Sequence, residues 1–218
     1  MIFVRHRTPV WLGVLCVTVA LAGCAPLTSP VRTSEASTST PESTTPTPTP
    51  SAPMSTKPAD WVITFDGVGP LTLGGSLAAE LPATAPAYEV AAADDCPNPT
   101  TSILKAESNP TIWLQSTGEG SDEIGLIAIG GDVPDDARMS GSPRTEKGVK
   151  VGSSLNELLA AYPTGTREGT PESPPFRFLV KGADASQEDR YLVFTIDKDV
   201  VQTILVQTHP GVVHEFCG

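Results

Sequence analysis

The chain repeats itself at Leu71-Thr72-Leu73-Gly74-Gly75-Ser76-Leu77 and, 78 positions later (71 to 149), at Val149-Lys150-Val151-Gly152-Ser153-Ser154-Leu155. Both stretches read apolar, polar, apolar, Gly, small, Ser, Leu. At the same spacing three further pairs coincide: Trp113 with Tyr191, Leu126 with Ile204, and Ile127 with Leu205. Self-similarity at one fixed spacing indicates a duplicated supersecondary unit. We therefore expect two tandem units, at about 66–131 and 146–209.

The second unit predicts a helix directly after its heptapeptide. Ser154 and Glu157 have the spacing of a capping box, in which each side chain satisfies a free backbone N–H at the helix start. Apolar residues then recur at i, i+3, i+4 and i+7, which indicates one buried stripe. Its members are Leu155, Leu158, Leu159 and Tyr162. In the first unit Ser76 can cap a helix, but Pro82 and Pro86 should break it within two turns.

Alternating apolar residues predict three strands after each helix. The expected strands are 101–106, 111–116 and 124–129 in the first unit, and 176–180, 191–196 and 200–208 in the second. Gly118-Glu119-Gly120 and Asp197-Lys198-Asp199 should turn the two hairpins. Because three strands and one helix form a thin core alone, we expect the two units to associate. The prediction is an α+β domain with a mostly antiparallel sheet and helices on one face.

The step from glycine to a capping serine, at Gly74-Gly75-Ser76 and Gly152-Ser153-Ser154, resembles two known groups. One is the tandem helix-plus-sheet modules of the β-lactamase inhibitor protein type. The other is the single-unit small lipoproteins of the outer-membrane barrel-assembly machinery. The resemblance implies this fold for 60–218. It does not imply inhibition, because the inhibitor's disulfides lie within each repeat and the cysteines here are placed differently.

The N-terminus has the composition of an export signal. Arg5 and Arg7 precede an apolar stretch of about 15 residues, shorter than the ~20 that span a bilayer. Its ending, Leu21-Ala22-Gly23-Cys24, resembles the lipobox of bacterial lipoproteins. The resemblance implies that residues 1–23 are removed and that lipid, palmitate included, on Cys24 anchors the chain to the extracytoplasmic face of the cell membrane. The alternatives are an ordinary signal peptide and an uncleaved anchor helix.

Residues 24–59 are rich in Thr, Ser and Pro and bury almost no apolar surface. Such a segment cannot offset the entropy cost of ordering, and its prolines favour an extended polyproline II conformation. We therefore expect a disordered, semi-rigid stalk that holds the folded domain away from the membrane.

The cysteines indicate one disulfide. Of four cysteines, Cys16 leaves with the signal and Cys24 carries lipid, so Cys96 and Cys217 remain. Export into an oxidising compartment favours a bridge between them, the alternatives being two free thiols or a redox pair. The formal net charge of −11 argues against nucleic acid as a partner. It also leaves the lipid as the expected membrane contact, because no polybasic patch is present.

No motif for catalysis, a cofactor or a metal stands out. His209 and His214 are separated by Pro210 and Gly211, so no helix can present both to zinc. The acidic stretches 132–136 and 197–199 lack the alternating ligands of a calcium loop. There is no Gly-x-Ser-x-Gly elbow, and a catalytic triad would need one of these two histidines as its base. We therefore predict no catalytic, cofactor or metal residues.

The favoured function is a non-catalytic binding or interaction domain whose partner is a protein, a cell-wall component or a small molecule. Tyr191, Val193 and Thr195 give the last hairpin a half-apolar outer face, which is either a binding surface or is covered by packing between the units or by residues 171–175. Two alternatives are a secreted hydrolase whose site is built from scattered acidic residues, and a structural envelope protein. A pocket with converging, pKa-shifted groups would favour the enzyme.

Overall fold

The computed structural model describes residues 55–85, 87–131, 140–169, 175–211 and 215–218. The export signal, Cys24 and residues 24–54 of the expected stalk lie outside these residues, as does His214. Residues 55–59, expected at the end of the stalk, contact the domain: Pro58 is buried at the start of a short 3-10 helix, η1 (Pro58–Asp60). Neither helix of the described chain has the length and apolar character needed to cross a bilayer.

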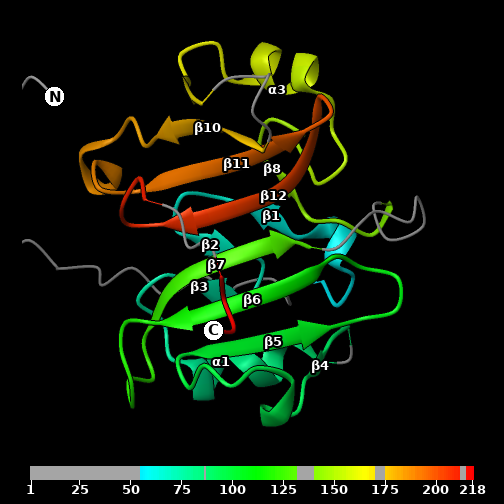
Figure 1. The fold of residues 1–218 in the computed structure, drawn as a ribbon, viewed down its shortest axis with the longest axis vertical. Helices are drawn as coiled ribbons and strands as arrows, with labels where there is room; N and C mark the ends of the chain where they lie inside the picture. Colours follow the sequence, from blue (N-terminus) through cyan, green and yellow to red (C-terminus); the bar gives the residue numbers. More distant parts are fainter. Residues whose placement is uncertain (1–54, 86, 132–139, 170–174, 212–214) are drawn as a thin grey trace, which may run out of the picture. The chain divides into compact units, whose positions relative to one another are not determined.

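Most of the strand residues in the described chain belong to one antiparallel sheet of eight strands, in the order β4-β5-β6-β7-β12-β11-β10-β9 (Figure 1). The strands are β4 (Glu89–Val90), β5 (Thr101–Lys105), β6 (Thr111–Ser116), β7 (Ile124–Gly130), β9 (Thr166–Glu168), β10 (Phe176–Lys181), β11 (Tyr191–Asp197) and β12 (Val200–Gln207). The six longest correspond to the six predicted strands. β4 and β9 were not predicted, because two or three residues at a sheet edge are too few to show alternation.

A second sheet has four short strands, in the order β3-β2-β1-β8. Its strands are β1 (Val62–Ile63), β2 (Gly67–Val68), β3 (Leu71–Thr72) and β8 (Arg144–Thr145). β1 pairs with β8 in parallel, whereas the other neighbours are antiparallel. The first heptapeptide thus begins as strand β3, and the second begins in a hairpin with β8, where Lys150 bridges to Arg144.

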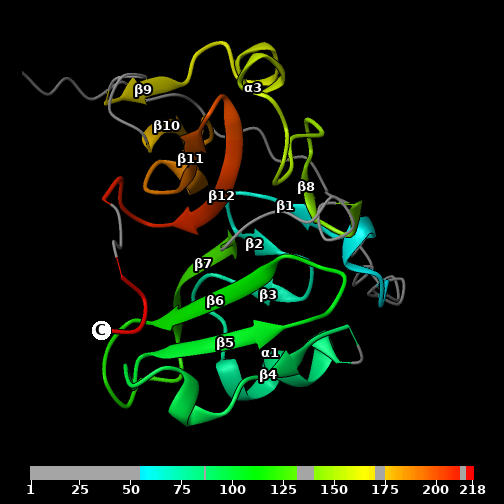
Figure 2. The same cartoon turned by 45° about the vertical axis from the view of Figure 1, so that its right-hand side comes forward.

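Both predicted helices form, at opposite ends of the large sheet (Figures 1 and 2): α1 (Leu77–Thr84) and α3 (Leu155–Ala161). The capping box of α3 is confirmed, since the Glu157 N–H donates to Ser154 Oγ (3.2 Å) and the Ser154 N–H donates to Glu157 Oε2 (2.7 Å). Pro82 does not break α1, contrary to the prediction, but the helix ends at Thr84 after about two turns, as predicted; Pro86 lies outside the described residues. In a two-turn helix the proline removes one late hydrogen bond, and Asp122 supports the start by accepting from the Ala78 N–H (2.9 Å).

One face of the large sheet carries the main core. Side chains from β5, β6, β7, β10, β11 and β12 pack there against the small sheet and both helices; Ile127, Phe194 and Leu158 are fully buried examples. The opposite face carries a smaller cluster that includes Leu126, Ala128, Leu179, Val193 and Leu205.

The expected matches Leu126–Ile204 and Ile127–Leu205 are wrong, because each joins residues of opposite sheet faces. The two glycines bond to strand residues at another spacing: the Gly74 N–H donates to Ile124 O (2.7 Å), and the Gly152 N–H donates to Val201 O (2.8 Å). Ile124 and Val201 are 77 positions apart, one fewer than the two glycines. A shift of one residue reverses the face of every side chain in a strand, which explains the error.

Candidate functional site

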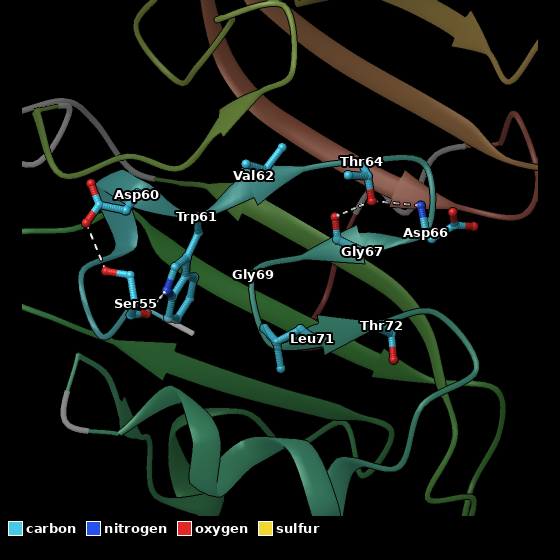
Figure 3. Close-up of a pocket in the computed structure, with 10 residues that line it drawn as sticks. All are labelled: Ser55, Asp60, Trp61, Val62, Thr64, Asp66, Gly67, Gly69, Leu71 and Thr72. Atoms are coloured by element: carbon cyan, nitrogen blue, oxygen red, sulfur yellow. Dashed lines mark hydrogen bonds between the residues drawn. The ribbon is translucent and has the colours of Figure 1, made fainter. Parts of the chain in front are cut away.

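An open groove crosses the small sheet and the segment before it (Figure 3). Its volume is about 310 Å³, at the lower end of the ~300–1,000 Å³ typical of small-molecule sites. We call it the β1–β3 groove; its lining residues are Ser55, Asp60, Trp61, Val62, Thr64, Asp66, Gly67, Gly69, Leu71 and Thr72. Val62 is 44% exposed, one of two large apolar side chains that the described residues leave exposed, together with Val90.

The groove owes its shape to close packing around Trp61. A Cβ atom at Gly69 would lie 2.5 Å from Cδ2 of the Trp61 ring, and Gly69 has a φ of +55°, which favours glycine. The hairpin between β2 and β3 can therefore lie directly against the indole. Because Gly67 also lacks a side chain, this part of the groove is bounded by backbone.

Trp61 forms a rigid wall. Its Nε1–H donates to the Ser55 carbonyl (2.7 Å), and its ring lies 5.7 Å from that of Tyr88, tilted by 33°. Only 2% of Trp61 is exposed. Tyr88 is buried behind it, its hydroxyl without a hydrogen-bond partner among the described residues, and this burial raises its pKa. The aromatic wall is thus held in place before any ligand arrives.

Two carboxylates lie at opposite ends of the groove (Figure 3). Asp60 Oδ2 accepts from Ser55 Oγ (2.8 Å). Asp66 Oδ2 accepts from Gln187 Nε2 (3.3 Å), and its Oδ1 is 3.9 Å from Nε of Arg190. None of the ten lining residues is basic. The groove therefore combines an apolar middle with negative ends.

A second candidate surface lies at the C-terminus. Cys96 and Cys217 form a disulfide, as the cysteine count predicted. We call residues 215–218 the C-terminal strap. Phe216 of the strap stacks on Trp113 of β6, with ring centroids 5.5 Å apart and planes 15° apart. The Phe216 carbonyl accepts from Asn98 Nδ2 (2.9 Å) and Thr101 Oγ1 (2.8 Å).

The strap packs on an apolar row that crosses the large sheet. Successive strand pairs place these residues side by side: Ile103, Trp113, Ala128, Leu205, Val193 and Leu179. All but Trp113 are buried. Of the two alternatives for the hairpin face, the covered one is confirmed at Val193, which packs with β7 and β12 residues. Thr195 bonds to Thr203, and Tyr191 is half-buried. Residues 171–174, an alternative cover, lie outside the described chain.

Within the described part of the chain, the acidic and histidine candidates do not gather as metal ligands. His209 offers its backbone carbonyl to Gln207 Nε2 (2.6 Å). Lys198 and Asp199 have φ values of 50° and 61° and form the tight turn between β11 and β12. In the described residues no three His, Cys, Asp or Glu side chains gather as metal ligands. Residues 132–136 lie outside this part of the chain.

The pKa shifts in the described chain belong to structural positions. The hydroxyl of Ser76, and then the Ala78 N–H, lower the pKa of Asp122, and the backbone and hydroxyl of Ser154 lower that of Glu157. Both carboxylates thereby support a helix start. Burial raises the pKa of Tyr162. A further hollow of about 530 Å³ contains Tyr88, Glu89, Lys105 and Glu107, but Lys105 Nζ is paired with Asp95 outside it (2.8 Å).

No protein-family model matches the chain, and neither a curated protein nor a solved structure shows significant similarity to it.

Proposed function

We propose that this chain is a lipoprotein, held on the extracytoplasmic face of a cell membrane by lipid on Cys24, whose folded part is a non-catalytic binding module. Its binding site is the β1–β3 groove, and its partner is a protein or cell-wall component. The observation that carries the proposal is the exposed apolar side chain of Val62 beside the rigid wall of Trp61. Preformed apolar hollows with few polar groups are typical binding sites.

The position of the groove is consistent with a binding site on a domain tethered by its N-terminal stalk. Ser55, the first described residue, lines the groove and accepts the hydrogen bond from Trp61. The groove therefore lies where the expected stalk joins the domain. A partner bound there would be held by a domain that the stalk keeps near the membrane but outside it.

We also propose that the domain arose from two tandem helix-plus-sheet units. The Leu77 N–H donates to Asp122 O and the Leu155 N–H donates to Asp199 O, both at 2.8 Å, so both helix starts contact the equivalent hairpin. The register between β7 and β12 is also symmetric. It pairs Ile127 with Val206 and Ile129 with Ile204, on either side of Ala128–Leu205. An experimental structure in which 66–131 and 146–209 fail to superpose would contradict this proposal.

The groove can be tested with a neutral apolar dye, N-phenyl-1-naphthylamine, whose fluorescence rises on binding to an apolar site. The protein is the full chain secreted without lipid as the Cys24→Ser variant. We expect saturable binding that Val62→Asp weakens at least about tenfold, because the substitution places a charge on the apolar wall. Val90→Asp is the matched control: Val90 is 55% exposed but lies at the β4 edge. Equal effects of the two variants, or no saturable binding, would contradict the proposed site.

A further inference from the structure

The β1–β3 groove has a charge pattern that selects among partners. Its middle is apolar: Val62 presents an exposed side chain, and Trp61 and Leu71 are buried beneath the surface. Its two ends carry the exposed carboxylates of Asp60 and Asp66. No lysine or arginine lines it. A ligand that matches this pattern has an apolar centre and a positive charge on one or both sides.

We propose that the groove binds a short cationic peptide segment, in which an apolar side chain is flanked by lysine or arginine. This inference rests on the proposed binding function and names the partner class for the same site. An extended segment fits better than a compact ligand, because the groove is open and is bounded partly by backbone at Gly67 and Gly69. A volume of about 310 Å³ accommodates only a few residues.

The negative charges of the two carboxylates are compensated to different extents by neighbouring residues. Asp60 interacts with the neutral hydroxyl of Ser55, so its charge is not compensated by that contact. Asp66 is partly compensated by Arg190, whose Nε lies 3.9 Å away, beyond hydrogen-bond distance. Removal of the Arg190 charge should therefore strengthen the binding of a cationic peptide, whereas removal of either carboxylate should weaken it.

The net charge of the chain favours the same partner, whereas the charges next to the groove are mixed, because Arg144 of β8 pairs in register with Val62 and Arg190 lies beside Asp66. The full chain has a formal net charge of −11, which attracts cationic segments over distance and repels acidic ones. Because the carboxylates are exposed, each contributes modestly, about two- to fivefold in affinity. The attraction must also weaken as salt increases, since the Debye length falls from about 30 Å at 0.01 M to about 3 Å at 1 M.

The test uses three acetylated and amidated pentapeptides: Lys-Val-Leu-Val-Lys, Gln-Val-Leu-Val-Gln and Glu-Val-Leu-Val-Glu. Each is titrated calorimetrically into the unlipidated full chain and is also used to displace the naphthylamine dye. We expect the lysine peptide to bind about tenfold more tightly than the glutamine peptide at low salt and to displace the dye, with no measurable binding of the glutamate peptide. High salt should remove most of the difference between the first two.

Variants separate the groove from the overall charge of the protein. Asp60→Asn and Asp66→Asn should each weaken the lysine peptide about two- to fivefold, and Arg190→Gln should strengthen it by a similar factor. Glu119→Gln is the matched control, because it removes one exposed charge in the turn between β6 and β7. Glu119→Gln should change the affinity for the lysine peptide only by the small amount expected from the loss of one negative charge on the protein.

Four results would overturn the partner class: equal affinity for the lysine and glutamine peptides, peptide binding without dye displacement, equal effects of Glu119→Gln and the two groove variants, or no binding of the lysine peptide. If the dye still binds and depends on Val62 in these cases, the proposed binding site stands and only the partner class fails. If the dye does not bind either, both proposals fail together.

Discussion

The bridge between Cys96 and Cys217 offers the largest stability effect that can be calculated from the structure. It joins residues 121 positions apart and therefore encloses most of the folded chain. The chain-entropy model assigns about 5 kcal/mol to a loop of this length, although engineered bridges often deliver less. We expect the double variant Cys96→Ser/Cys217→Ser to lose about 3–5 kcal/mol in free energy of unfolding. A domain of this size is commonly stable by only ~5–15 kcal/mol, so the loss is a large fraction of the total.

The measurement is equilibrium unfolding in urea, followed by far-ultraviolet circular dichroism, which reports the whole sheet. Thermal unfolding should show a midpoint lower by about 6–20 °C, at ~2–4 °C per kcal/mol for a domain of this length. Trp113 fluorescence, measured in a Trp61→Phe background, provides a local signal, because the indole of Trp113 is stacked against Phe216. If the strap detaches before the sheet unfolds, the fluorescence transition of the double variant will precede the dichroism transition.

The control is Phe216→Ala with the disulfide intact. Phe216 is only partly buried, so its loss should cost about 1–3 kcal/mol, less than the ~3–5 of a fully buried phenylalanine. The reasoning is refuted if the cysteine double variant is within about 1 kcal/mol of the parent while Phe216→Ala has its expected effect. That result would mean that side-chain contacts of the strap, and not closure of the long loop, provide the stability.

Three further predictions follow from individual residues. Gly69→Ala should lower the free energy of unfolding by about 2 kcal/mol or more, because the new Cβ would clash with the Trp61 ring and residue 69 has a positive φ. An unchanged midpoint of thermal or urea unfolding would contradict this packing. Hydrogen bonds from Ser154 lower the pKa of Glu157, so the stabilisation by the Glu157 carboxylate is present at neutral pH and is lost as the pH falls through its folded pKa. Glu157→Gln should therefore make the free energy of unfolding depend less on pH in the acidic range. An unchanged pH dependence would contradict the hydrogen bond. Cys24→Ser should abolish palmitate labelling and move the protein from the detergent phase to the aqueous phase; labelling that persists would exclude lipid at Cys24.

Local interactions explain most of what could be predicted about the fold. The Ser154–Glu157 capping box depends on residues three positions apart, and its hydrogen bonds form as expected. The Asp197-Lys198-Asp199 turn depends on neighbours, and so does the alternation in β6, whose predicted bounds agree with the structure. The Cys96–Cys217 pair followed from elimination, not geometry, and is present. The lipid anchor at Cys24 and the binding function stay predictions.

The wrong strand matches have a long-range cause. The two glycines are 78 positions apart in the sequence, whereas their hydrogen-bond acceptors, Ile124 and Val201, are 77 positions apart. The amino-acid sequence alone does not reveal this difference of one residue. Only the hydrogen-bond register shows that Leu126 and Ile204 face opposite sides of the sheet.

The sequence by itself determined the local elements: where α3 begins, which residues alternate in the six long strands, and which cysteines remain to pair. Only the tertiary structure decided the strand order, the edge strands β4 and β9, the cover that Phe216 places over the sheet, and the β1–β3 groove. The physical reason is the range of the interactions. Caps, turns and alternation depend on residues a few positions apart, whereas the groove exists because Trp61 packs against Gly69 and Tyr88, a contact that no periodicity in the sequence encodes.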